Sequence, residues 1–225
     1  MRTLAIGDIH GCLASLDTLL NLVRPTTDDL LVTLGDHVDR GPDSRGVLDR
    51  MLALHATGRV VSLRGNHEIM MAAARDGKSK ARYWYSHGGA EALDSYRELG
   101  RHVSLDDIPE RHWAFIESTT QLYYETETHI FVHANLHPDT ELADQPELYL
   151  CWETLDRKQH RPHCSGKTMV CGHTPQKNGR PLVLDHAVII DTWACGDGWL
   201  TCLDAGTGHY WQADELGRTR EGDLE

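Results

Sequence analysis

Three short polar clusters in the first third of the chain contain residue types that bind metal ions. Each follows an apolar run: residues 7–11 (Gly-Asp-Ile-His-Gly), 35–41 (Gly-Asp-His-Val-Asp-Arg-Gly) and 64–68 (Arg-Gly-Asn-His-Glu). Asp8 and His10 are two residues apart, so an extended backbone places both side chains on one face. The glycines permit sharp turns and leave room for ions and substrate. The clusters therefore predict a site of carboxylate, imidazole and amide groups.

Two later histidines also end apolar runs. His133 follows residues 130–132, and His173 follows residues 169–172. Mixed oxygen and nitrogen donors suit manganese, iron or zinc, whereas calcium prefers oxygen throughout. A carboxylate such as Asp36 can bridge two ions about 3.5–4 Å apart, as in two-metal hydrolytic sites. The residues of the predicted site are Asp8, His10, Asp36, Asn66, His67, His133 and His173.

Such a site suits the hydrolysis of a phosphate ester. The substrate is anionic and repels hydroxide, so two cations would neutralise charge and lower the pKa of a bridging water. The resulting hydroxide would attack phosphorus in line with the leaving oxygen. A single Gly-Asp pair usually marks a turn, and a single histidine at a strand end is usually structural. The combination of all these clusters in one chain favours the metal site.

The elements that must position these clusters alternate along the chain. Apolar runs at residues 3–6, 29–34 and 59–63 predict strands. Between them, residues 12–23 and 43–56 carry apolar side chains at helical spacing. This alternation is typical of parallel βαβ units. Ligands bind beyond the carboxyl ends of parallel strands, so the clusters after these strands should converge on one crevice.

The rest of the chain divides into a helical part and a strand-rich part. Helices are predicted at residues 68–75, 89–99 and 109–119. Strands are predicted at residues 122–125, 129–133, 168–171, 187–191, 200–204 and 208–212. Their spacing suggests hairpins in a second sheet, and residues 138–166 between them have no clear pattern. We predict one domain over residues 1–216 and a disordered polar tail over residues 217–225.

The composition is that of an ordinary globular protein. Of the 225 residues, 40% are hydrophobic and 25% are charged, and the net charge is −12. This charge argues against a nucleic-acid partner, which attracts clustered Lys and Arg. The sequence has neither the apolar run of about 18 residues that spans a membrane nor the apolar region of a signal peptide. We expect a cytoplasmic protein with six free cysteines and no membrane partner.

The three clusters closely resemble the signature motifs of the calcineurin-like metallophosphoesterase superfamily. The forms Asp-Arg-Gly at residues 39–41 and Arg-Gly-Asn-His-Glu at residues 64–68 resemble its phosphoprotein phosphatase branch. His133 in Val-His-Ala-Asn and His173 in Gly-His-Thr match the two later histidine motifs. The resemblance covers nearly the whole chain, residues 4–205. The compact length looks most like the small bacterial and phage-type Ser/Thr protein phosphatases.

The resemblance implies a fold and a metal centre. The fold is an α/β four-layer sandwich, in which two mixed β-sheets pack together and are flanked by helices. Asp8 and His10 would bind the first ion, and Asp36 would bridge to the second. The other ligands of the second ion would be Asn66, His133 and His173. Two divalent ions are expected, Mn²⁺ before Fe or Zn.

The resemblance also implies the residues that handle the substrate. Arg40 and Arg64 would grip the phosphoryl oxygens, since their forked donors stabilise charge in the transition state. His67 would be the general acid that protonates the leaving oxygen. Asp39 would fix the His67 ring and favour its charged form.

The sequence departs from the phage-type pattern in its middle segment. Those enzymes have an arginine shortly after a tryptophan, for phosphate binding. Here Trp152 is followed by Glu-Thr-Leu, and the next basic residues are Arg157 and Lys158. This departure leaves the choice of substrate open.

We expect a phosphorylated protein or peptide as the substrate, on serine, threonine or tyrosine. A small phosphoester substrate is an alternative. A further alternative is a symmetrical bis(5'-nucleosyl)-tetraphosphatase, which shares the motifs and splits a phosphoanhydride. Tyr83, Trp84 and Tyr85 could stack a nucleobase, or they could form the apolar face of a helix. Another alternative is a non-catalytic, metal-stabilised binding module. A chain of that kind should have lost His67, a metal ligand or the arginines, and this chain retains them.

Overall fold

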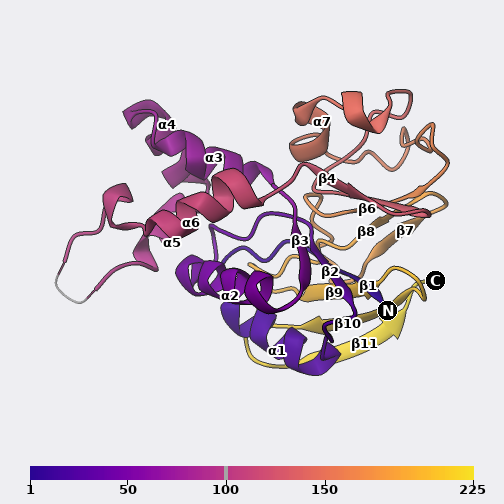
Figure 1. Ribbon diagram of the computed structural model, residues 1–225, viewed down its shortest axis with the longest axis horizontal. Helices are drawn as coiled ribbons and strands as arrows, with labels where there is room; N and C mark the ends of the chain where they lie inside the picture. The colour runs from indigo at the N-terminus through magenta and orange to yellow at the C-terminus, as the bar shows by residue number, and fades with distance from the viewer. Residues whose placement is uncertain (99–100) are drawn as a thin grey trace.

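Strand β1 (Thr3–Ile6) lies inside a six-stranded sheet (Figure 1). The computed structural model describes residues 1–98 and 101–225. β1 pairs in parallel with β2 (Leu30–Thr33), and β2 pairs in parallel with β3 (Arg59–Ser62). Helices α1 (Leu13–Val23) and α2 (Ser44–Thr57) connect these strands. The predicted βαβ arrangement is therefore confirmed.

The same sheet continues on the other side of β1 with three antiparallel strands. These are β9 (Leu200–Asp204), β10 (His209–Ala213) and β11 (Thr219–Asp223). The sequence placed the first two in a second sheet, which is wrong, because β9 pairs directly with β1. That pairing satisfies the backbone groups along the open side of β1.

The predicted disordered tail is also wrong. All five residues of β11 pair with β10. The Asp214 side chain holds the turn between the two strands, since its Oδ1 accepts the backbone N–H groups of Leu216 and Arg218 at 3.0 and 2.9 Å. A polar segment is ordered here because its backbone is hydrogen bonded into a sheet.

The second sheet has five strands in the order β4-β5-β6-β8-β7. Their bounds are Tyr123–Glu125, His129–Val132, Thr168–Cys171, Ala187–Ile189 and Leu182–Leu184, in that order. The expected hairpins occur only at the edges, because β5, β6 and β8 are parallel. The long segment between β5 and β6 contains η4 (Leu142–Asp144) and α7 (Glu147–Cys151). A connection of that length permits parallel pairing.

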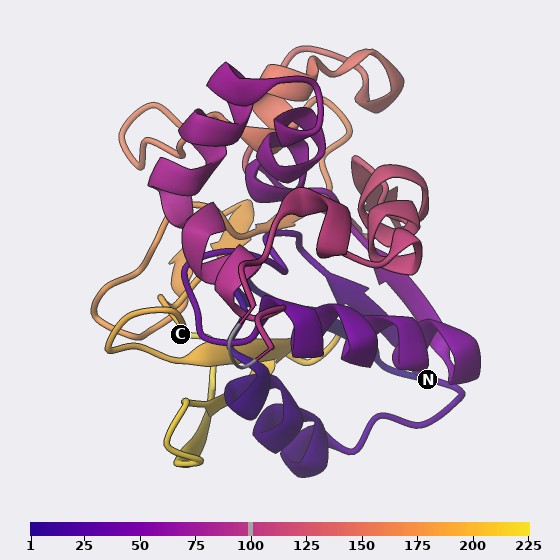
Figure 2. The same ribbon diagram turned by 90° about the vertical axis from the view of Figure 1, so that its left-hand side faces the viewer.

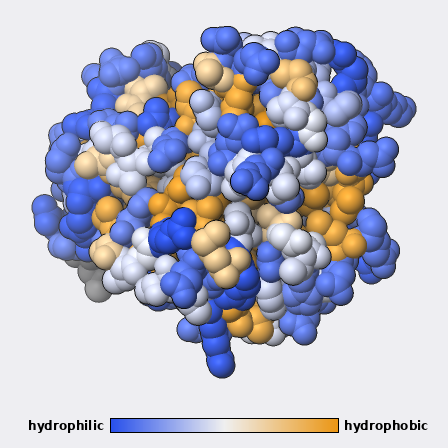
Figure 3. Space-filling view, turned by 45° about the vertical axis from the view of Figure 1, so that its right-hand side comes forward, coloured by the Kyte–Doolittle hydropathy of each residue, from blue (hydrophilic) through white to orange (hydrophobic). Residues whose placement is uncertain are grey.

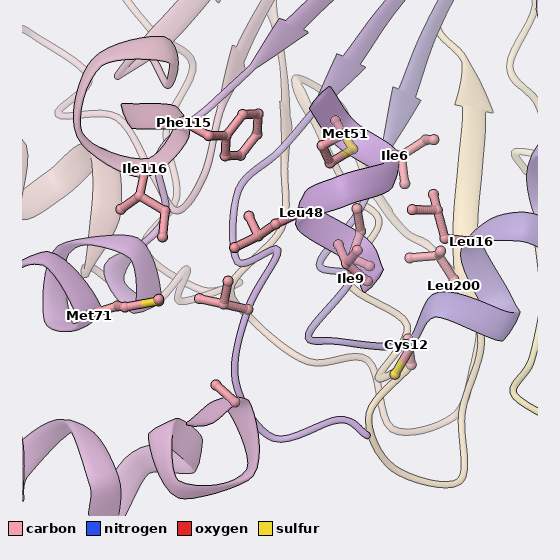
Figure 4. Close-up of a cluster of buried hydrophobic side chains, with 14 of the residues drawn as sticks. Ile6, Ile9, Cys12, Leu16, Leu48, Met51, Met71, Phe115, Ile116 and Leu200 are labelled. Atoms are coloured by element: carbon pink, nitrogen blue, oxygen red, sulfur yellow. The ribbon is translucent and has the colours of Figure 1, made fainter. Parts of the chain in front are cut away.

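Alternate residues of the strands separate the layers. Leu4 and Ile6 pack with α1 and α2, and Figure 4 shows Ile6 among the side chains of these helices. Ala5, between them, joins a second cluster with Phe131 from β5, which fills the space between the sheets. Ile130, the neighbour of Phe131, joins a third cluster with residues of α7. This pattern confirms the four-layer sandwich with two mixed sheets.

Residues 66–98 and 101–119 form a helical cap on one side of the molecule (Figures 1 and 2). Its elements are α3 (Asn66–Ala74), α4 (Lys78–Trp84), η1 (Tyr85–Gly89), α5 (Ala90–Asp94), η2 (Leu105–Asp107), α6 (Glu110–Ala114) and η3 (Phe115–Thr119). Helix α4 and the kinked segment η1 were not predicted. The predicted helix at residues 89–99 is shorter, and Leu99 lies outside the described residues.

One face of the molecule is largely polar. Hydrophilic residues cover most of the face in Figure 3, and hydrophobic residues are scattered among them. Within residues 1–98 and 101–225, no helix is both long enough and apolar enough to cross a membrane. The six cysteines are free thiols.

Candidate active site

The clusters predicted from the sequence meet at the carboxyl ends of β1, β2 and β3. The first two are tied together by their backbones: the N–H groups of Ile9 and His10 both donate to the carbonyl oxygen of Asp36, at 3.1 and 2.7 Å. The third cluster begins helix α3 and joins them through the N–H of His67, which donates to Asp36 Oδ1 at 3.0 Å. The predicted convergence is therefore present.

The backbone of this region is unusual. Five site residues that are not glycine have left-handed φ angles between 45° and 73°. They are His10, Asp36, Asp39, Arg40 and His173. Such angles are uncommon for residues with a side chain, and they persist where surrounding contacts hold them, often at functional sites.

Two groups of metal-binding side chains share Asp36. His10, Asp36 and His67 offer ligand atoms within 4.8 Å of one another, and so do Asp36, His133 and His173. Asp36 Oδ2 lies 3.4 Å from His10 Nε2, and Oδ1 lies 3.5 Å from His133 Nε2. The two carboxylate oxygens thus face opposite groups, which is the geometry that a bridging ligand needs.

Asn66 and Asp8 complete the set from either side. Asn66 Oδ1 lies 3.1 Å from His133 Nε2, beside the second group. The Asp8 carboxylate is buried and accepts the backbone N–H of His173, at 3.2 and 3.1 Å to its two oxygens. The structure thus brings all six predicted metal ligands together.

The ring orientations of the three histidines fit metal binding. Backbone carbonyl groups accept from one nitrogen of each ring: Val38 from His10 Nδ1 at 2.9 Å and Leu34 from His133 Nδ1 at 2.9 Å. His173 Nε2 donates to the carbonyl of Trp152 at 3.0 Å. A histidine ligand usually donates its other ring N–H in this way, which fixes the tautomer and aims the free nitrogen at the ion. The other nitrogen of each ring lies beside a predicted ligand, and that of His10 also lies 2.8 Å from Arg40 Nη1.

The electrostatics of the site also fit two cations. Burial raises the pKa of Asp8 well above its usual range, and the neighbouring Asp191 and Asp36 raise it further. Burial likewise raises the pKa of Asp36 and of Asp191 to about 6 each. Three buried carboxylates repel one another, and bound cations would relieve that repulsion. Burial lowers the pKa of His133 to about 4 and of His173 to about 3, which favours the neutral form that binds metals.

His67 has the geometry of a proton donor. Its Nδ1 lies 2.7 Å from Asp39 Oδ2. Its Nε2 is buried and has no hydrogen-bond partner among the described residues, and it lies 4.0 Å from Asp36 Oδ2. Burial lowers the pKa of this ring, despite the nearby Asp36. Burial thus outweighs the preference for the charged form that we expected from Asp39.

The two predicted phosphate-binding arginines differ in orientation. Arg40 enters the site, with Nη1 2.8 Å from His10 Nε2. Arg64 does not: its Nε donates to Thr120 Oγ1 at 2.9 Å and its Nη2 to the carbonyl of Glu117 at 2.8 Å. Carbonyl groups in the last turn of a helix lack partners within the helix, so the end of η3 attracts this guanidinium.

The possible replacements for the missing arginine also lie elsewhere. Arg157 Nη2 donates to Gln176 Oε1 at 2.7 Å, three residues along the chain from His173. Lys158 is exposed, and its backbone N–H donates to Asp156 Oδ1 at 2.9 Å. Neither side chain is paired with a ligand residue in this structure.

The sequence reasoning missed Asp191 and Glu68. Asp191 is buried next to Asp8, two residues beyond β8, and the apolar strand before it was a usable signal. Glu68 Oε2 accepts the N–H groups of Asp36 and Gly65, at 2.9 and 2.8 Å. Its Oε1 accepts the N–H of His37 at 2.8 Å. Glu68 occupies the third position of α3, where a capping carboxylate is common, and here it fixes the second and third clusters to each other.

Gly172 offers a test of the ligand geometry. A Cβ atom at this position would overlap Asp8 Oδ1. We expect Gly172→Ala to displace the Asp8 carboxylate and weaken metal binding by about 10–100-fold, the cost of disturbing the groups that orient a metal ligand. Titration with Mn²⁺ of protein from which metal has been removed by a chelator measures the affinity. Gly206→Ala is the matched control, because its Cβ would meet Asp204 Oδ1 at an ordinary 3.4 Å. Equal affinities in the two variants would contradict the prediction.

Comparisons with known proteins agree with this geometry. Residues 1–197 match the family described as "Calcineurin-like phosphoesterase". The chain is 44% identical to "Serine/threonine-protein phosphatase 1" of Salmonella typhimurium, over 87% of this chain and 88% of the relative. It is 31% identical to "Bis(5'-nucleosyl)-tetraphosphatase, symmetrical" of Ralstonia nicotianae, over 80% of this chain. It spans only 57% of that relative.

Solved structures share the fold. A putative diadenosine tetraphosphatase superposes with a TM-score of 0.65 at 22% identity, covering 100% of this chain and 94% of that one. The cold-active protein-tyrosine phosphatase of a Shewanella species superposes with a TM-score of 0.64 at 18% identity, covering 98% of this chain and 80% of that one. Together with the family match, these similarities lead to one conclusion. The chain belongs to the calcineurin-like phosphoesterase family, hydrolases that act on phosphoester bonds at a dinuclear divalent metal site.

Proposed function

We propose that this chain is a serine/threonine protein phosphatase. The observation that carries the proposal is the 44% identity to a protein phosphatase over 88% of the length of that relative. The tetraphosphatase of Ralstonia nicotianae has a longer chain, of which this one spans about half (57%).

In this proposal, each site residue has one role. Asp8, His10 and Asp36 would hold the first ion, and Asp36 would be shared with the second. The remaining ligands of the second ion would be Asn66, His133 and His173. The bound ions supply positive charge to the phosphoryl oxygens and lower the pKa of water. Mixed nitrogen and oxygen ligands suit Mn²⁺, and Fe or Zn are compatible.

The remaining residues bind the phosphate and move a proton. Arg40 reaches into the site and donates to the phosphoryl oxygens. Asp39 holds Nδ1 of His67, so the proton at Nε2 can pass to the leaving oxygen. Arg64 would reach the phosphate only after leaving the end of η3. An anionic substrate would have to replace these hydrogen bonds as the partner of the guanidinium.

The second candidate is a symmetrical dinucleoside tetraphosphatase. The cap carries exposed aromatic residues near the site: Tyr83 is 51% exposed and packs 4.2 Å from His87, ring centre to ring centre. Arg40 N–H donates to the Gly88 carbonyl, which places this part of the cap beside Arg40. Such rings could stack a nucleobase.

A substrate panel separates the two candidates. The chelated protein is supplied with Mn²⁺, Fe²⁺ or Zn²⁺ and assayed with a phosphoserine peptide, a phosphothreonine peptide, a phosphotyrosine peptide and diadenosine tetraphosphate. We expect turnover of the phosphoserine and phosphothreonine peptides, fastest with Mn²⁺. Turnover of the dinucleotide alone would rule out the phosphatase and establish the tetraphosphatase. We also propose a cytoplasmic location, which fits the free thiols.

Replacement of His67 tests the proposed acid. We expect His67→Asn to lower kcat on a phosphoserine peptide about 10²-fold, because the alkoxide then leaves without a proton. On p-nitrophenyl phosphate, whose leaving group needs little protonation, the loss should be much smaller. His129→Asn is the control, since this ring lies at the start of β5 outside the ligand groups. An equal loss on both substrates would remove His67 as the acid.

A further inference from the structure

Trp84 of the helical cap is hydrogen bonded to Asp39, the residue that holds the His67 ring. The Trp84 side chain is fully buried, and its indole Nε1 donates to both carboxylate oxygens of Asp39, at 2.9 Å each. Asp39 Oδ2 in turn lies 2.7 Å from His67 Nδ1. The three side chains form a line that runs from the cap to the proton-donating nitrogen.

The indole N–H satisfies a carboxylate that has little other support. Asp39 is fully buried, and among the described residues its carboxylate is hydrogen bonded only by the Trp84 indole and the His67 ring. Burial raises the pKa of Asp39, and the Trp84 hydrogen bond opposes that rise. A buried carboxylate that loses one of two donors is left partly unsatisfied, so its position becomes poorly fixed.

The local backbone is built to place this indole. Trp84 ends α4, and the following segment η1 contains a kink at His87 and Gly88, where Gly88 has a φ of 110°. A Cβ on Gly89 would overlap the Trp84 ring, so glycine is required for the indole to lie there. The Gly88 carbonyl accepts the Arg40 N–H at 3.1 Å.

We propose that Trp84 is a positioning residue for the general acid. Its indole N–H fixes the Asp39 carboxylate, which holds the His67 ring so that Nε2 faces the leaving oxygen. The inference rests on the proposed role of His67 as the acid. It assigns to one turn of the cap the alignment of both the acid, through Trp84, and Arg40, through Gly88.

The first test is Trp84→Phe, which keeps an aromatic ring and removes the N–H. We expect kcat to fall about tenfold on alkyl and phenyl phosphates, the scale of a lost hydrogen bond to a charged group. On p-nitrophenyl phosphate the change should be small, with KM and metal content as in the wild type. The dependence of kcat on leaving-group pKa should therefore become steeper. Uniform loss across the series would indicate a merely structural role and overturn the proposal.

A double-mutant cycle sharpens this test. If Trp84 acts through His67, adding Trp84→Phe to His67→Asn should cause no further loss of kcat. If the loss of kcat in the double variant equals the product of the two single losses, the proposal is contradicted. The cycle also separates the two hypotheses. If His67→Asn does not make the dependence of kcat on leaving-group pKa steeper, the proposed acid fails. If His67→Asn makes it steeper and Trp84→Phe does not, only the role of Trp84 fails.

Two further variants distinguish the loss of the indole N–H from a general effect on folding. Trp113→Phe is the matched control, because Trp113 is equally buried in the cap and its cation–π partner is Arg75. It should leave the leaving-group dependence as in the wild type. If Trp84→Phe does not fold, benzothienylalanine at position 84 keeps the shape of indole and lacks the N–H. A folded protein with this residue and a wild-type dependence would overturn the proposal.

Discussion

Asp36→Asn is expected to remove activity almost completely. The two oxygens of the Asp36 carboxylate face His10 and His133, one each, at 3.4 and 3.5 Å. An amide has one oxygen and no charge, so it cannot serve both ligand groups. We expect fewer than two ions per chain by mass spectrometry of the metal content and a fall in kcat of about 10³-fold, the upper range for one preorganised electrostatic group.

The control for this variant is Asp204→Asn. Asp204 is also buried, but it lies at the end of β9 and accepts the Gly206 N–H at 3.0 Å, a bond that asparagine can retain. Its metal content and kcat should match the wild type. If Asp36→Asn retained two ions per chain and nearly full activity, Asp36 would not be the bridge.

The second large effect is on stability. Glu68 is fully buried, and both of its carboxylate oxygens act as hydrogen-bond acceptors. Their partners are the N–H groups of Asp36, His37 and Gly65 and the His37 ring at 3.2 Å. In Glu68→Gln, the side-chain NH₂ would face two of these donors. We expect the free energy of unfolding to fall by about 3 kcal/mol, the scale of a broken buried pair. Urea unfolding of the chelated protein measures this without the contribution of metal binding.

The pH dependence of this effect has a defined sign. Burial alone would raise the pKa of Glu68, but His37 and the backbone donors outweigh burial and lower it from 4.5 to about 2. A lowered pKa in the folded state means that the carboxylate stabilises the protein above pH 4.5. This stabilisation is lost as the pH falls through 4.5 toward 2. The difference between wild type and Glu68→Gln should therefore shrink across that range.

Glu125→Gln is the control for the stability experiment. Glu125 is 42% exposed at its side chain and pairs with Lys167 at 2.8 Å. Exposed pairs contribute about 1 kcal/mol or less, so this variant should change stability little at any pH. If Glu68→Gln were as stable as Glu125→Gln, Glu68 would not be the anchor between the second and third clusters.

The site was more predictable from sequence than the contacts around it. Asp8, His10 and Asp36 are close in the chain to strand ends, and local patterns place them. The direction of Arg64 depends on η3, more than 50 residues away, and no local pattern encodes it. The Trp84 contact with Asp39 likewise depends on how the cap packs. The apolar runs predicted β9 and β10 as strands, but the choice of β1 as partner is a tertiary effect.

The arrangement of the ligands has a further consequence for assembly of the chain. Asp36 follows β2 of the first sheet, whereas His133 and His173 follow β5 and β6 of the second. An ion held by these three residues would act as a staple across the sandwich, as a disulfide does in a secreted protein. Its binding energy would then count directly as folding energy. A nascent chain that has not yet reached His173 lacks the last of these ligands, so metal capture and the locking of the two sheets would be coupled events in biosynthesis.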